Sequence, residues 1–269
     1  IAAYHMNIPT AHIHGGDKTK GGIDEYNRHA ITKMSNIHFA ATKKSLNRIL
    51  KMGENKKFVF LTGSPSIDEI VKNKITGKKD LETKYNLNFT GTEILLLQHP
   101  VTTETKKVEK QIKNTLDALS RIGKITIAIA PNSDTGSNVI FNYLKKYSEK
   151  YSFIRVYPSL PREDYLGMLK NCGLLLGNSS SGIIEASYFN IPVVNIGIRQ
   201  EKREHGKNVV NISSNSRIIY KTILKFLGKK KKSYNNKNLY GHGDTSKKIV
   251  KYLESIKLDD ELIQKQIIY

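Results

Sequence analysis

Short apolar runs alternate with segments of helical periodicity along most of the 269-residue chain. The apolar runs end at glycine, proline or polar residues, and they predict strands at residues 8–13, 37–42, 58–62, 93–97, 125–130, 153–156, 174–176 and 193–196. Apolar residues spaced by three and four predict helices at residues 24–34, 45–52, 138–150, 162–171, 182–189 and 246–256, with two more that follow residues 63–65 and 102–104.

Several predicted strands are apolar at almost every position, as in Leu174-Leu175-Leu176. Strands without polar alternation are typical of a parallel sheet that is covered by helices on both faces. Together with the regular alternation of strand and helix, this predicts a doubly wound parallel α/β fold. The polar stretch at residues 77–92, with a short helix near residues 81–85, is predicted as a linker between two blocks.

The excess of basic residues does not change the predicted fold. The chain has 44 Lys and Arg residues against 24 Asp and Glu residues, a formal charge of +20. The lysines are spread along the chain, and no nucleic-acid-binding motif accompanies them, so we expect a solvated surface and no nucleic-acid partner. No apolar run approaches the ~18 residues that span a bilayer, so we expect no membrane partner. The single Cys172 excludes an intrachain disulfide and indicates a reducing, cytoplasmic setting.

The most informative stretch is a serine-rich turn between a buried strand and a helix. Ser179, Ser180 and Gly182 are small, and the N–H groups at a helix start favour a phosphate. Glu185 in the same helix can accept from the two hydroxyls of a ribose. The alternative is ordinary helix capping by Ser180 or Ser181, with Glu185 closing a capping box.

Three further polar residues follow other predicted strands. His99, Asn132 and Arg199 come after strands 93–97, 125–130 and 193–196. Open α/β sheets bind ligands at the carboxyl ends of their strands, so we expect these side chains and the serine turn to share one crevice. Taken alone, the histidine is consistent with a structural role and the arginine with a helix cap.

A possible acid–base group lies near the start of the chain. His14 and Asp17 belong to a glycine-containing turn after the first predicted strand. Asp24 and Arg28 share a helix face at spacing i, i+4, and so do Glu25 and His29. A carboxylate beside a guanidinium stays ionised, which suits a base or an electrostatic anchor. The alternative is a surface salt bridge.

These stretches together resemble the UDP-N-acetylglucosamine 2-epimerase family, and its hydrolysing branch, which serves sialic-acid-type sugars, is the closer match. The resemblance rests on HIHGGDKTKGGIDEYNRHAITKMSNIHF, LLLQHPVTTE, IAPNSDTGS, GNSSSGIIEASYFNIPVVNIGIRQ and YGHGD. It implies a GT-B-like fold of two Rossmann-like parallel-sheet domains, of which the first is incomplete here. The implied division is residues 1–85, residues 86–245, which bind UDP, and residues 246–269, which cross back onto the first domain.

The resemblance also implies roles for individual residues. It makes Asp24 and Arg28 catalytic, with Asp17 as a partner carboxylate, although His14 stands where many members have Glu. It implies substrate contacts for a second set, of which His99 is also implied to be catalytic: His99, Asn132, Ser179, Ser180, Gly182, Glu185 and Arg199. No metal and no cofactor is implied, and a homodimer or homotetramer is expected.

The function implied by the resemblance is hydrolysis of UDP-N-acetylglucosamine to UDP and N-acetylmannosamine through 2-acetamidoglucal. Two alternatives stay within the family: a reversible, non-hydrolysing 2-epimerase and a 2-epimerase for a diacetamido-UDP-sugar. A third is a fragment that binds UDP but is catalytically incomplete. The chain begins at Ile1, and a substrate-binding arginine and a Gly-Asp-Arg segment are expected upstream, so an N-terminally truncated member is predicted.

Overall fold

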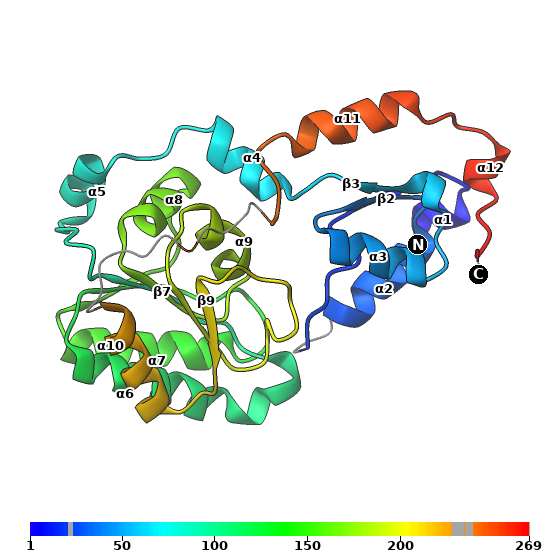
Figure 1. Ribbon diagram of the computed structural model, residues 1–269. Coiled ribbons are helices and arrows are strands. Elements are labelled where there is room, and N and C mark those ends of the chain that lie inside the picture. The colour runs from blue at the N-terminus through cyan, green and yellow to red at the C-terminus, as the bar shows by residue number, and fades with distance from the viewer. Residues whose placement is uncertain (21–23, 228–233, 235–238, 269) are drawn as a thin grey trace.

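Two parallel sheets organise the part of the chain that the computed structural model describes, residues 1–20, 24–227, 234 and 239–268 (Figure 1). The smaller sheet has the order β1-β2-β3 and the larger sheet has the order β6-β5-β4-β7-β8-β9. Every recorded strand pairing is parallel, which confirms the predicted α/β class. The strands are β1 (Ala11–Ile13), β2 (Ile37–Ala40), β3 (Val59–Leu61), β4 (Ile94–Leu97), β5 (Thr126–Ile129), β6 (Ile154–Tyr157), β7 (Leu174–Gly177), β8 (Val193–Ile196) and β9 (Val209–Ile212).

Helices connect the strands and cover both faces of the larger sheet (Figure 1). On the side of the smaller sheet lie α1 (Ala2–His5), α2 (Asp24–Met34) and α3 (Lys43–Lys51). The larger sheet is associated with α5 (Lys78–Tyr85), η2 (Thr102–Lys107), α6 (Val108–Ile122), α7 (Ser137–Lys150), α8 (Arg162–Asn171), α9 (Ser181–Tyr188) and α10 (Ser216–Leu227). Helix α4 (Pro65–Lys72) follows β3 and packs against α9 of the larger sheet and against α11 (Thr245–Ser255). No helix in the described ranges is both long enough and apolar enough to cross a membrane.

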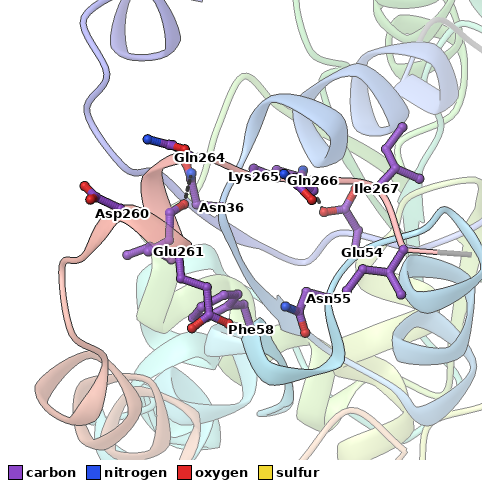
Figure 2. A pocket seen from close by; sticks show the side chains of 12 residues that line it. Asn36, Glu54, Asn55, Phe58, Asp260, Glu261, Gln264, Lys265, Gln266 and Ile267 are labelled. Carbon is purple, nitrogen blue, oxygen red and sulfur yellow. Dashed lines mark hydrogen bonds and ion pairs between the residues drawn. The ribbon is translucent and has the colours of Figure 1, made fainter.

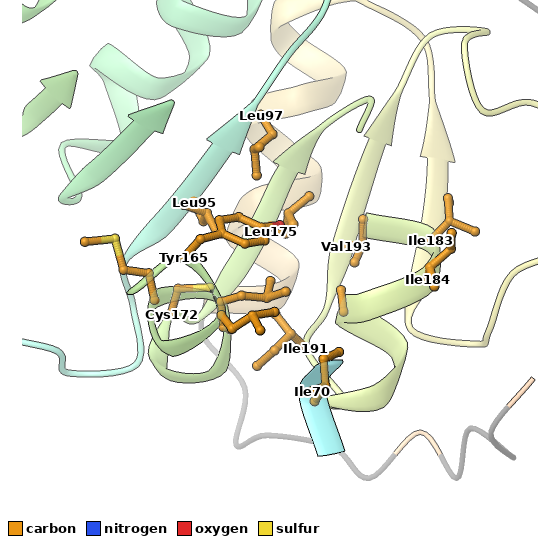
Figure 3. Close-up of a cluster of buried hydrophobic side chains, with 14 of the residues drawn as sticks. Ile70, Leu95, Leu97, Tyr165, Cys172, Leu175, Ile183, Ile184, Ile191 and Val193 are labelled. Carbon is orange, nitrogen blue, oxygen red and sulfur yellow. Dashed lines mark hydrogen bonds between the residues drawn. The ribbon is translucent and has the colours of Figure 1, made fainter. Parts of the chain in front are cut away.

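Alternating side chains of the central strands supply two apolar layers. Leu95 and Leu175 point into one buried cluster, together with Cys172 and residues of α8 and α9 (Figure 3). Ile94 and Leu174, one position earlier, point into a second cluster with α6, α7 and α10. This two-sided burial explains why the sequence of β4 and β7 shows no polar alternation.

The C-terminal segment packs on the smaller sheet. Helices α11 (Thr245–Ser255) and α12 (Asp260–Ile263) run beside β3 and β2 (Figure 1). Tyr252 of α11 stacks on Phe60 with ring centroids 4.1 Å apart, and Leu262 of α12 is buried in the same cluster.

Beyond α12 the tail is fastened by a buried ion-pair cluster. Lys265 Nζ lies 2.6 Å from Glu54 Oε2, beside a cavity of about 420 Å³ (Figure 2). Glu54 also contacts Lys33 at 2.7 Å and His38 at 2.9 Å, and its side chain is 1% exposed. The same ammonium donates to the carbonyl oxygens of Thr32, Lys33 and Ser35 at 2.7–3.2 Å, so it caps the C-terminal end of α2.

Some elements differ from the prediction. The segment predicted as a linker is packed: α5 lies against α8, and Leu81 and Phe89 are buried with the larger sheet. The edge strand β9 and helix α10 were not predicted. Strand β9 exposes Val210 and Asn211 and therefore lacks the pattern of a buried strand. The first predicted strand is shortened to β1. The basic run 229–232 lies outside the described residues.

Two chain crossings join the sheets side by side. The first is at Gly63, between β3 and α4, and the second is at residues 240–245, before α11. Gly63 has φ +96°, and a Cβ there would lie 2.8 Å from Thr245 Oγ1 and 3.0 Å from Tyr240 O. Asp68 of α4 accepts from the N–H groups of Thr245 and Ser246 at 2.9 and 2.7 Å, so the first crossing caps the helix that follows the second.

Candidate functional site

A cavity of about 450 Å³ lies at the carboxyl ends of β4, β5 and β7. The strand order reverses between β4 and β7, and ligands bind at such switch points in open α/β sheets. His99, Asn132, Ser179, Ser180 and Glu185 all line this cavity. The predicted crevice therefore brings together His99, Asn132 and the serine turn, but Arg199, which was predicted to share it, does not line it.

Asn178 fixes the position of His99, and the sequence analysis missed it. Its buried side chain accepts from His99 N at 2.7 Å and donates to His99 O at 2.9 Å. Two bonds to one residue's backbone lock the end of β4 to the end of β7. The available signal was its place as the first polar residue after a buried strand.

The environment of His99 keeps its ring neutral. Burial and the nearby charge of Arg199 lower the pKa of His99 to about 4. His99 Nδ1 lies 3.2 Å from both the backbone N and the side-chain Oδ1 of Asn132, so Asn132 holds the ring in either tautomer. Near pH 7 the neutral His99 ring can therefore form a hydrogen bond with a ligand without bringing a positive charge.

Glu185 does not close a capping box. Ser180, the N-cap of α9, makes no side-chain capping bond. Glu185 is buried; Oε2 accepts from Ser181 Oγ, and Oε1 lies 2.5 Å from Arg162 Nη2. The capping alternative is thus wrong, and the carboxylate is held at the cavity wall.

Arg162 is a second cavity residue that sequence reasoning missed. It begins α8, lies 5.6 Å from the centroid of the Tyr165 ring, and pairs with Glu69 of α4 at 2.9 Å as well as with Glu185. Arg162 therefore holds the Glu185 carboxylate in place and links it to Glu69 of α4. A basic residue directly after Ser-Leu-Pro at a predicted helix start was the only signal.

Two predicted contacts do not line the cavity. Gly182 is buried, and a Cβ there would lie 3.0 Å from Val193 Cγ1, so its role is to let α9 pack closely on the sheet. Arg199 instead donates to Asn178 O at 3.1 Å. Burial lowers the pKa of Arg199, and the charges of Asp24 and Asp134 partly oppose that shift.

In the loop that follows β1 of the smaller sheet, Asp17 is buried and surrounded by hydrogen-bond donors. Ser45 Oγ lies 2.7 Å from Oδ1, and Arg203 Nη2 and His14 Nδ1 lie 2.7 and 3.2 Å from Oδ2. Burial alone would raise the pKa of Asp17, but the hydrogen bond from His14 and the charge of Arg203 hold it far below its usual range. Arg203 was not predicted, because its partner is 186 residues away.

The predicted pairing of Asp24 with Arg28 is wrong. Arg28 Nη1 lies 2.9 Å from Glu25 Oε2 and donates to Asp17 O at 3.1 Å, whereas Glu25 also lies 3.4 Å from His29 as expected. Asp24 is exposed at the start of α2, and its charge acts on Arg199. Helix α2 therefore places the charge of Asp24 near Arg199, which follows β8. Arg28 of the same helix holds the Asp17 loop through its hydrogen bond to the Asp17 carbonyl oxygen.

Gly177→Ala should destabilise the protein because Gly177 ends β7 under the serine turn. It has φ +133°, and a Cβ there would lie 1.9 Å from Leu97 O. We expect the free energy of unfolding to fall by about 3 kcal/mol, from left-handed strain and overpacking together. The control is Gly123→Ala, where φ is +67° but nothing lies within 4 Å, with an expected loss of about 1 kcal/mol. Equal losses in urea unfolding would contradict this account.

Comparison with known proteins agrees with this architecture. Residues 1–254 match the family described as UDP-N-acetylglucosamine 2-epimerase. The chain is 37% identical, over 98% of its length, to UDP-N,N'-diacetylbacillosamine 2-epimerase (hydrolyzing) of Legionella pneumophila. It is 38% identical, over 83% of its length, to polysialic acid biosynthesis protein P7 of Escherichia coli. It spans 69% and 57% of these two relatives.

A solved structure shares the fold. The crystal structure of Methanocaldococcus jannaschii UDP-GlcNAc 2-epimerase in complex with UDP-GlcNAc and UDP matches with a TM-score of 0.76 at 21% identity, covering 94% of this chain and 71% of that one. The fold is accordingly GT-B-like, with two Rossmann-like parallel sheets. By sequence, the chain belongs to the UDP-N-acetylglucosamine 2-epimerase family.

Proposed function

We propose that this chain is part of a hydrolysing UDP-sugar 2-epimerase that acts on UDP-N-acetylglucosamine or on a diacetamido-UDP-sugar. The observation that carries the proposal is the cavity at the switch point, where Glu185, the serine turn and neutral His99 converge. The hydrolysing reaction is favoured because the Legionella relative, 37% identical, is named as hydrolysing and as acting on UDP-N,N'-diacetylbacillosamine.

In this proposal the nucleotide lies across the cavity. The buried Glu185 carboxylate accepts from the ribose hydroxyls, and Ser179, Ser180 and the start of α9 bind the diphosphate. Arg199, four residues beyond Asn195 of β8, adds a positive charge to the same end of the sheet. His99 Nε2 and Asn132 form hydrogen bonds with the diphosphate or with the sugar.

The chemistry needs a base, a stabilised leaving group and a water molecule. A carboxylate removes the proton at C2 while the C1–O bond to UDP breaks, and the C2–H electrons form the C1=C2 bond of a glycal. Water then adds across that bond, with OH at C1 and H at C2, to give the free 2-epimeric sugar. We assign the base to Asp24, which is exposed, and a positioning role to Asp17 and His14, because Asp17 is already held ionised by its neighbours.

The direct test incubates the complete protein with UDP-N-acetylglucosamine and, separately, with the diacetamido-UDP-sugar. We expect UDP and a free 2-epimeric sugar in proton NMR, with deuterium at C2 when the solvent is D2O. Recovery of a nucleotide-linked epimer alone would favour the reversible reaction instead. UDP binding with no sugar product would favour the binding-only alternative.

Glu185→Gln should weaken UDP binding by about 10- to 100-fold, because a carboxylate accepts ribose hydroxyls more strongly than an amide does. Calorimetry with UDP and with 2′-deoxy-UDP checks the cause: the preference for UDP should shrink in the variant. Glu163→Gln is the matched control, since Glu163 is an exposed carboxylate in the first turn of α8. An unchanged preference for UDP would show that Glu185 does not contact the ribose.

A further inference from the structure

The loop between β8 and β9 faces the loop that follows β1. Its Arg203 lies 2.7 Å from Asp17, and Glu201 and Glu204 lie 3.0 Å from Lys20 and 3.6 Å from Lys44. In the first pair the side chains are 11% and 3% exposed, whereas both lysines of the other pairs are about half or more exposed. Exposed pairs contribute little, so the buried Arg203–Asp17 pair dominates this contact between the two sheets.

The same loop also reaches His14. The His14 ring stacks on Tyr240 with centroids 6.2 Å apart, and Tyr240 donates its hydroxyl to Glu204 O at 2.7 Å. The other side of His14 is fixed because Nε2 lies 3.0 Å from Ser64 Oγ and Nδ1 lies 3.2 Å from Asp17. His14 is held at φ +67°, an unfavourable conformation for a residue with a Cβ, so its surroundings must hold it there.

Arg203 is connected to the serine turn by hydrogen bonds within its own loop. Its N–H donates to Gln200 O, and Nη1 donates to Gln200 Oε1, both at 3.1 Å. Gln200 Nε2 and Arg199 Nη1 in turn donate to Asn178 O at 3.3 and 3.1 Å. Arg199 and Arg203 therefore belong to one hydrogen-bonded unit, which is fastened at the head of the serine turn.

We propose that Arg203 is a positioning residue that couples a nucleoside diphosphate in the cavity to the arrangement of Asp17 and His14 on the opposite side. The inference rests on the proposed function for the identity of that ligand. A diphosphate at the serine turn anchors the β8–β9 loop, and the anchored loop keeps the Arg203 guanidinium on Asp17. Without Arg203 the buried carboxylate loses its cation, while the proposed nucleotide contacts stay intact.

The kinetic test uses Arg203→Gln, Arg203→Lys and the control Lys20→Gln in the complete protein. For Arg203→Gln we expect kcat to fall about 100-fold and the Kd for UDP to change less than about threefold, because the reacting groups are displaced and the nucleotide site is not. Arg203→Lys should recover about tenfold of the loss by restoring the charge. Lys20→Gln, which removes an exposed pair, should leave kcat within about twofold.

Two kinetic outcomes overturn the inference. A parallel loss of UDP affinity and kcat would make Arg203 a direct nucleotide ligand, and an unchanged kcat would remove its role.

Hydrogen exchange gives a readout that does not depend on turnover. In the wild-type protein UDP should slow amide exchange at residues 178–184 and also at residues 14–19, in the loop that follows β1. In Arg203→Gln only the protection at residues 178–184 should remain. Protection at residues 14–19 that persists in the variant overturns the coupling alone. A wild-type protein that binds no UDP overturns the proposed function together with the coupling.

Discussion

Asp24→Asn should reduce turnover of the UDP-sugar by about 10³-fold, because a neutral amide cannot remove the proton at C2. Asp24 is exposed in the first turn of α2, and its charge acts on Arg199, which follows β8 of the larger sheet. The variant should still bind UDP with a Kd within about threefold of wild type, since the proposed nucleotide contacts are elsewhere. Single-turnover kinetics and calorimetry measure the two effects separately.

Asp80→Asn is the control for the charge change. Asp80 is also exposed and lies in the first turn of a helix, α5, so both variants remove one exposed negative charge from the first turn of a helix. We expect Asp80→Asn to have wild-type turnover. If Asp24→Asn kept more than about a tenth of the wild-type rate, another group would be the base.

Glu54→Ala should lower the free energy of unfolding by about 3–4 kcal/mol, because it removes the buried carboxylate that pairs with the partly buried ammonium groups of Lys33 and Lys265. The Glu54 carboxylate joins Lys33 of α2, His38 of β2 and Lys265 of the tail. Glu261→Gln is the control: its pair with Lys57 has side chains 51% and 58% exposed, and its loss should cost less than about 1 kcal/mol. Urea unfolding measures both, and equal losses would contradict the structural account.

The contribution of Glu54 should also depend on pH. Burial opposes the ionised form, but hydrogen bonds from His38, Lys265 and Lys33 outweigh it and lower the pKa of Glu54 to about 2. A carboxyl whose pKa is lower in the folded state stabilises the protein above its unfolded pKa of roughly 4.3, and this contribution is lost as the pH falls toward 2. Between pH 5 and about 2, the stability of Glu54→Ala should therefore fall less steeply than that of wild type.

The sequence was informative about those candidate site residues that follow a local pattern. His99, Asn132 and the serine turn each follow a buried apolar strand, so parallel topology alone brings them together at one sheet edge. Arg203 and Arg162 could not be found in this way. Each acts through a partner on another element, Asp17 and Glu185 respectively, and no local spacing records such a pair.

The wrong pairing within α2 has a similar cause. Spacing i, i+4 allows Asp24 to meet Arg28, but the guanidinium turns toward the Asp17 carbonyl, a tertiary contact, and takes Glu25 at i, i+3 instead. Edge strand β9 escaped detection for a different reason. Its exposed positions carry no burial constraint, so its sequence does not resemble that of β4 or β7.

The two chain crossings have a mechanical consequence. Gly63 and Gly241 meet where the connections lie side by side, and a Cβ at Gly63 would be 3.2 Å from Gly241 Cα. Two connections that lie side by side define one hinge axis, because rotation about the line through both connections stretches neither of them. Asp68 ties the start of α11 to α4 next to that line, which resists sliding and twisting. We therefore expect the two sheets to move relative to each other mainly by rotation about this axis. Small-angle scattering with and without UDP would measure that change.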